Sequence, residues 1–212
     1  MSVTGTGRVS IAPDEAEVRL GVSVTMDTVA AARQATAEVS DRIVAAVTAR
    51  GVAPADIQTA SLQVQPQIDY PDGRPVVRGQ QVSHQYALTI RDLTQLGPVI
   101  DDAIDVGATT VDSVAFRSSR RAAAESEARS RAMAAARSTA EQLASDAGAR
   151  LGRVLAIVDG TVPGPPRPMP MSRLAAMAES APTPIETGSL EVDALLTVTW
   201  ELVEASARAT GS

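Results

Sequence analysis

The chain contains no cysteine and only one histidine, His84. Disulfide bridges, thiolate nucleophiles and cysteine-ligated metal centres are therefore excluded. Aromatic residues make up 2% of the 212 residues, and they are Tyr70, Tyr86, Phe116 and Trp200. With so few large rings, the core has to be aliphatic and rich in alanine. Small side chains fill a core well only where backbones approach closely.

Positive charge is also scarce, because 19 Lys and Arg stand against 25 Asp and Glu, a formal net charge of −6. Nucleic-acid binders need clustered positive charge, and those that bind single strands also need aromatic platforms. The sequence therefore argues against a nucleic-acid partner. No apolar run approaches the roughly 20 residues of a membrane-spanning helix, so we expect no transmembrane segment.

The first residues, MSVTGTGR, lead directly into a strand pattern, without the basic and then apolar regions of a signal peptide. As given, the chain is predicted to be cytoplasmic. A mature form trimmed of its signal peptide would look the same, and such a protein would be periplasmic or secreted.

Alternation of polar and apolar residues predicts the strands. Residues 3–11 and 16–24 flank the turn sequence Pro13-Asp14, and we expect them to pair as a hairpin. The run 154–160 is apolar on both faces, which predicts a strand that is central in its sheet or covered on both sides. The remaining strands are predicted near 57–65, 82–91, 109–118 and 192–202.

Three helices are predicted from apolar residues at three- and four-residue spacing. The first follows Asp27 as N-cap and ends at Gly51, and the second spans about 93–106. The third runs from Ser119 to about Ala147 and consists almost entirely of helix formers. Its alanines mark the packing face, so we expect it to lie close to a sheet.

The predicted order is ββα, ββα, βα, β, long loop, β, which indicates an α+β fold with antiparallel sheets flanked by about three helices. Residues 160–189 break the pattern with a proline-rich excursion, and residues 206–212 read as a disordered tail. Residues 1–205 are predicted to form a single domain, alternatively built as two interlocked α+β halves.

Several segments in order resemble one known family. They are GTGRVSIAPDEAEVRLGV (5–22), GVAPADIQTASLQVQPQIDY (51–70), DLTQLGPVIDDAIDVGATTVDSVAF (92–116) and GARLGRVLAIVDG (148–160). This set is similar to the SIMPL-domain family of poorly defined function, which includes bacterial periplasmic immunogenic proteins and an oxidative-stress defence protein. The resemblance implies an α+β fold, ring-like homo-oligomers in some members, and no established active site.

Gly5 and Gly7 raise the question of a phosphate-binding loop. A dinucleotide fingerprint needs a third glycine and a following helix, whereas Ser10 and a second strand follow here. A twist, a bulge or a close backbone approach is the favoured interpretation.

Other candidate sites have a structural interpretation beside the functional one. His84 lies on the apolar face of its predicted strand with no partner for catalysis or metal binding in the sequence. Asp101, Asp102 and Asp105 cluster on the second predicted helix, and Asp101 and Asp105 share a face where carboxylates could bind a hard cation. A solvated acidic face is the default interpretation of the cluster. The serines of the third predicted helix lack the G-x-S-x-G nucleophile elbow.

Arg117, Arg120 and Arg121 gather at the start of the third predicted helix. Cations there oppose the helix dipole, so their presence suggests partners: a carboxylate, another subunit or an anionic ligand.

Two functional hypotheses follow. The first is a non-enzymatic homo-oligomeric scaffold or binding module that needs no cofactor and no metal, and acts in envelope or oxidative-stress physiology. The second is an enzyme or small-molecule binder in which the arginine cluster holds an anionic ligand.

Overall fold

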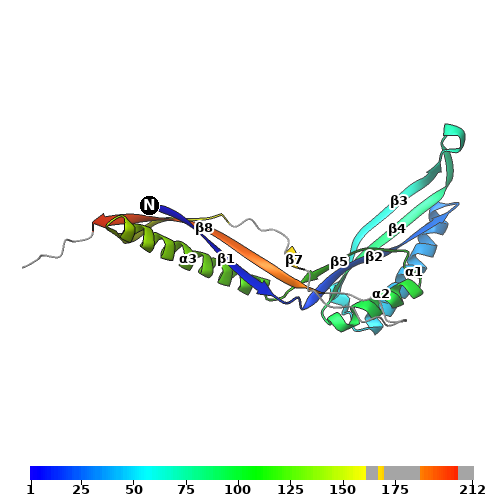
Figure 1. Ribbon diagram of the computed structural model, residues 1–212. Helices are drawn as coiled ribbons and strands as arrows, with labels where there is room; N and C mark the ends of the chain where they lie inside the picture. The colour runs from blue at the N-terminus through cyan, green and yellow to red at the C-terminus, as the bar shows by residue number, and fades with distance from the viewer. Residues whose placement is uncertain (161–166, 170–186, 205–212) are drawn as a thin grey trace, which may run out of the picture. The chain divides into compact units, whose positions relative to one another are not determined.

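The computed structural model describes residues 1–160, 167–169 and 187–204, and every structural statement below concerns these residues. The chain divides into two compact units (Figure 1). The first unit contains residues 1–12, 118–160, 167–169 and 188–204, and the second contains residues 13–117 together with Thr187.

The first unit is an antiparallel sheet, here called the first sheet, with one long helix on one face (Figure 1). Its central strand is β8. This strand pairs with β1 along one side, and with β6 and β7 at different positions along the other side. The elements are β1 (Ser2–Ile11), α3 (Arg121–Asp146), β6 (Ala149–Asp159), β7 (Arg167–Met169) and β8 (Ser189–Glu204).

Helix α3 packs on the first sheet through a ridge of alanines spaced four residues apart. All six are buried, and they are Ala124, Ala128, Ala132, Ala136, Ala140 and Ala144. Opposite this ridge, β1 presents glycines: a Cβ atom built on Gly5 would lie within 3.0 Å of the Ala132 carbonyl oxygen, and one on Gly7 within 3.0 Å of the Ala128 carbonyl oxygen. The helix backbone therefore lies almost directly on the strand, as an alanine-rich core requires. The close-approach interpretation of these glycines is confirmed.

The second unit is a four-stranded antiparallel sheet, here called the second sheet, with strand order β3-β4-β2-β5. Two helices cover one face and enclose an aliphatic core that includes Leu20, Ile43, Leu88 and Val99 (Figure 1). The elements are β2 (Glu15–Met26), α1 (Val29–Ala49), β3 (Ile57–Asp69), β4 (Val76–Ile90), α2 (Leu96–Asp105) and β5 (Thr110–Arg117), with 3₁₀ turns at Pro54–Asp56, Pro71–Gly73 and Leu93–Gln95.

The predicted fold class and element order are confirmed: three helices with two antiparallel sheets. The short strand β7 lies inside the predicted excursion 160–189. Residues 161–166 and 170–186 of that excursion, and the predicted tail 206–212, lie outside the described residues.

The predicted hairpin across Pro13-Asp14 is wrong. Strand β1 pairs with β8, while β2 pairs with β4 and β5 in the other sheet. The buried residues of the two strands explain the separation. Gly5 and Gly7 of β1 fit a closely packed helix, whereas Val18 and Leu20 of β2 fill a wider aliphatic core under α1 and α2.

Two smaller predictions also need correction. The apolar run 154–160 forms most of β6, which borders the first sheet within the described residues; Leu155 is 54% exposed and Ile157 is 56% exposed. An apolar pattern reports what a strand can bury, and here no described element covers it.

The N-cap of α1 is Thr28, whose hydroxyl accepts a hydrogen bond from the Ala31 amide, one residue after Asp27.

We predict that Gly7→Ala lowers the free energy of unfolding of the first unit by about 2 kcal/mol, because the added methyl group meets the helix backbone, which cannot rotate away. On a strand without such a neighbour, a Gly→Ala substitution would raise the free energy of unfolding by roughly 0.5–1 kcal/mol. Urea denaturation followed by the fluorescence of Trp200, which is buried in this unit, measures the change. Thr6→Ala, on the exposed side of β1, is the control, and equal stabilities of the two variants would contradict the close packing.

Candidate functional site

The three arginines predicted as a cluster lie on two elements. Arg117 is the last residue of β5 in the second unit, while Arg120 and Arg121 lie at the start of α3 in the first unit. Arg121 forms an ion pair with Glu125 one helical turn later. Arg120 forms no ion pair with any described residue. The three arginines therefore belong to different elements and different units, and Arg117 is considered separately.

Arg117 shares one carboxylate with a second arginine on the neighbouring strand. Glu17 of β2 contacts the Arg117 guanidinium through Oε2, and its Oε1 lies 3.4 Å from Nε of Arg19. The Glu17 side chain is 17% exposed, whereas each arginine side chain is 57% exposed. The carboxylate thus lies deeper than the two guanidinium groups, and one positive charge remains uncompensated at this point.

These three residues line a hollow on the face of the second sheet that faces away from α1 and α2, here called its open face. The hollow has a volume of about 410 Å³. Two small side chains, Ala60 and Ala87, leave space among longer neighbours. Gln58, Thr59 and Thr89 complete the lining, and the hydroxyl of Thr59 contacts Nε2 of His84.

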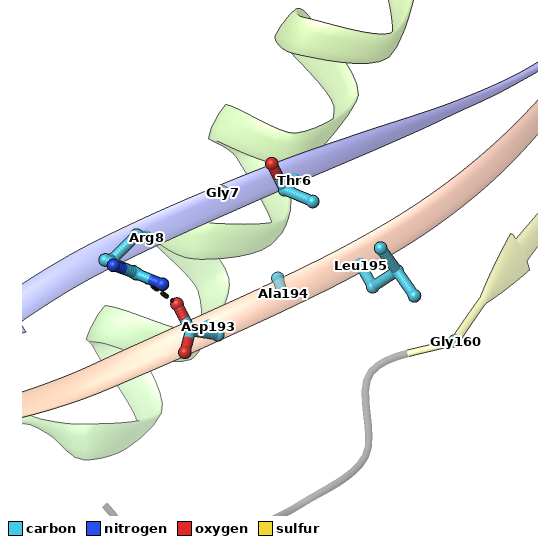
Figure 2. Close-up of a pocket in the computed structure, with 7 residues that line it drawn as sticks. All are labelled: Thr6, Gly7, Arg8, Gly160, Asp193, Ala194 and Leu195. Atoms are coloured by element: carbon cyan, nitrogen blue, oxygen red, sulfur yellow. Dashed lines mark hydrogen bonds and ion pairs between the residues drawn. The ribbon is translucent and has the colours of Figure 1, made fainter. Parts of the chain in front are cut away.

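A larger hollow of about 620 Å³ lies on the first sheet, where β1 and β8 pair (Figure 2). Its arginine, Arg8, lies 2.7 Å from Asp193 and 3.6 Å from Glu191. The hydrogen bond with Asp193 and the charges of both carboxylates raise the pKa of Arg8 above its ordinary value. Because two carboxylates lie beside the one guanidinium, Arg8 offers no uncompensated positive charge to a ligand in this hollow.

A third hollow, of about 250 Å³, lies where the loop after α1 meets the end of β4. Its two arginines are each held by a carboxylate, Arg50 by Asp102 and Arg91 by Asp56, in two-point contacts of 2.5 to 2.9 Å. Hydrogen bonds from these arginines lower the pKa of both Asp56 and Asp102. Asp102, predicted to lie on a solvated acidic face, therefore forms an ion pair.

His84 lies among hydroxyl groups on the helix-covered side of β4. Its Nδ1 is 3.1 Å from both the Ser40 hydroxyl of α1 and the Tyr86 hydroxyl, and its Nε2 is 3.2 Å from the Thr59 hydroxyl of β3. Each hydroxyl can donate or accept, so a neutral imidazole satisfies both ring nitrogens. Burial lowers the pKa of His84 below its ordinary value of 6.5.

A serine beside a histidine invites comparison with a nucleophile and its general base. Ser40 is 4% exposed, however, and lies in the middle of a helix. Neither Ser40 nor His84 lines any of the three hollows, and the second ring nitrogen faces a threonine instead of an orienting carboxylate. The contacts fit a polar network that joins α1 to β3 and β4.

Metal binding finds no support in the described part of the chain. No three or more His, Asp or Glu side chains gather there in a way that could hold a metal ion. The pair Asp101 and Asp105 on α2 has no third ligand of that kind among the described residues.

Sequence reasoning identified Arg117 but missed Arg19 and Glu17 as its neighbours. Alternation along β2 places Glu17 and Arg19 on one face, so the sequence indicated that these two side chains are neighbours. The pairing of β2 with β5, which brings Arg117 to them, joins residues about 100 positions apart.

We predict that His84→Gln flattens the pH dependence of stability between about pH 7 and pH 5. Because the folded-state pKa is lowered, the unfolded chain binds a proton more readily. The stabilisation is therefore complete above pH 6.5 and is lost as the pH falls through the folded-state value. Thermal unfolding followed by circular dichroism measures this in the parent chain and the variant. The chain has no other histidine, so an unchanged slope in the variant would contradict the assignment.

Comparison with known proteins gives the same family throughout the chain. The family model SIMPL, described as a protein of unknown function (DUF541), matches residues 1–200. The 26 kDa periplasmic immunogenic protein of Brucella melitensis is 30% identical over 212 residues, which cover 95% of this chain and 84% of the relative. The uncharacterized protein YggE of Escherichia coli is 27% identical over 200 residues, 94% of this chain and 81% of the relative. The chain therefore belongs to the SIMPL family.

Proposed function

We propose that this protein is a non-enzymatic module that assembles with copies of itself and acts in the bacterial envelope. The observation that carries the proposal is the exposed apolar edge of the first sheet, strand β6. Its run from Val154 to Val158 contains no charge, no proline and no glycine. Four of its side chains are among the exposed large hydrophobics of the protein, and they are Val154, Leu155, Ile157 and Val158.

An edge strand of this kind is a template for pairing with another strand, because one row of its backbone groups lacks a partner in the sheet. Natural edges are usually protected by charges, proline or bulges. Strand β6 has bulges between Leu151 and Ala156, and its last part, Ala156–Asp159, pairs regularly with β8. That last part is exposed at every residue.

A second copy of the same strand is the partner that the charges favour. The apolar run is bounded by Arg153, which pairs with Glu201 within the chain, and by Asp159, which pairs with Arg129. Two copies that pair antiparallel bring the arginine end of each strand near the aspartate end of the other. Parallel pairing would place like charges together, which is unfavourable. Such a two-fold arrangement is the commonest symmetry of soluble oligomers.

Of the two edge strands of the second sheet, β3 and β5, the longer one, β3, is less suited to pairing than β6. Strand β3 carries Pro66, which cannot donate a backbone hydrogen bond, and glutamines alternate along it. Its exposed apolar residues, such as Leu62, are therefore separated by polar side chains. This contrast supports the choice of β6.

The envelope location and the absence of enzymatic activity are parts of the proposal. The name of the Brucella relative, a periplasmic immunogenic protein, supports the location. No helix of the described residues has both the length and the apolar character required to cross a bilayer. The buried position of Ser40 beside His84 supports a non-enzymatic role.

We predict that the chain elutes as a species larger than its 21.9 kDa monomer, and that Ile157→Lys converts it to a monomer. A lysine in the middle of the apolar run places like charges beside each other in any pair formed by β6. Size-exclusion chromatography with light scattering at micromolar concentration measures the mass.

The matched control is Val77→Lys at the β3–β4 hairpin, where the exposed fraction is 59% against 56% for Ile157. It should leave the mass unchanged. A parent chain that is monomeric would refute the assembly, while dissociation by Val77→Lys and not by Ile157→Lys would move the interface to the other sheet.

A further inference from the structure

We propose that the hollow on the open face of the second sheet binds a small oxyanion, a phosphoryl or dicarboxylate group, between Arg19 and Arg117. The proposal does not depend on self-assembly, because every residue that lines the hollow belongs to the second unit and none to β6.

The first argument is local charge. Arg19, Arg117 and Glu17 together carry one net positive charge, whereas the other two hollows contain as many carboxylates as guanidiniums or more. Arg117 also lies opposite Glu15 across the β2–β5 pair, and Arg91 contacts both Glu15 and Asp56, so these last three residues carry one net negative charge. The positive excess is thus limited to Arg19, Glu17 and Arg117. A ligand that gains from it has to contact both guanidiniums directly, so it has to be small.

The second argument is the supply of donors. A guanidinium carries five N–H donors in a planar fork that matches carboxylate and phosphate oxygens. The contacts with Glu17 involve Nε of Arg19 and Nη2 of Arg117. Within the described residues, neither guanidinium group has a further partner. Most donors of both side chains therefore remain for a ligand on the solvent side, where each side chain is 57% exposed.

The third argument is space with matching polarity. Ala87 lies opposite Arg19 across the β2–β4 pair and opposite Gln58 across the β3–β4 pair. Its methyl group leaves the floor of the hollow open between two long side chains. The amide of Gln58 and the hydroxyl of Thr89 lie on the lining, where they can donate to anion oxygens that the arginines do not reach.

Glu17 has a defined role in this arrangement. It orients both guanidiniums from below, and it also competes with the ligand for their charge. Replacement of Glu17 by glutamine keeps a carbonyl acceptor and raises the local charge from +1 to +2. A site for anions then binds more tightly, whereas a purely architectural ion-pair cluster shows no gain in affinity.

The experiment is a titration of the full chain, labelled with ¹⁵N, with inorganic phosphate and separately with malonate, at ionic strength held constant with chloride. We expect saturable shifts of the amides of Ala87, Thr89 and Ala115. Arg19→Gln and Arg117→Gln should each weaken binding about tenfold or more, since charge-assisted hydrogen bonds are lost. Arg78→Gln, which removes the same charge at the β3–β4 hairpin, should leave the affinity unchanged.

Two further variants separate a binding site from simple charge. Ala87→Leu fills the hollow without a change in charge and should abolish binding, and Glu17→Gln should strengthen it. Spectra of each variant establish that it is folded. Response to phosphate alone assigns a phosphoryl site, to malonate alone a dicarboxylate site, and to both an unselective oxyanion site. No saturable shift at millimolar ligand, or equal weakening by Arg78→Gln, would overturn the proposal.

Discussion

The close approach of α3 to β1 is the constraint on which the first unit depends. A helix whose buried face is almost entirely alanine has little apolar surface to bury, so it is stable on a sheet only if the two backbones nearly touch. Gly5 and Gly7 permit that contact, because a side chain at either position would collide with helix backbone atoms. Van der Waals contact between many small groups here replaces the burial of a few large ones. Trp200 is the largest fully buried side chain in this core.

Each sheet has one covered face and one open face, and the open faces differ in chemistry. On the first sheet, cross-strand partners satisfy each other, as in Ser2 with Thr199, Thr4 with Thr197 and Arg8 with Asp193. On the second sheet, Arg19 and Arg117 share one carboxylate and keep unused donors. A ligand binds more favourably where donors on an open face have no partner, because on a fully paired surface it would have to replace existing hydrogen bonds. Strand β6 is comparable, because along its outer edge the backbone N–H and C=O groups lack a partner strand among the described residues.

The sequence predicts the elements well and their neighbours poorly. Alternation along β2, β4 and β8 and the alanine ridge of α3 are local patterns, and each is found where it was expected. The pairing of β1 with β8 joins the two ends of the chain, and no local pattern encodes it. The same limit applies to the candidate site. Arg117 was visible as an unusual cation, while its real partners, Glu17 and Arg19, are brought to it only by the ladder between β2 and β5.

By itself, the sequence determined the family, the α+β class, the aliphatic and alanine-rich character of the core, and the exclusion of cysteine chemistry. The family follows from the resemblance of several ordered segments to known proteins. The other features follow from composition and from periods of two and four residues, which act over short stretches of chain. The tertiary structure alone decided which strand borders each sheet, which arginines share a carboxylate, and that His84 lies among three hydroxyl groups. These features depend on contacts between distant segments, whose register is fixed by the burial of whole faces and not by the residues that meet.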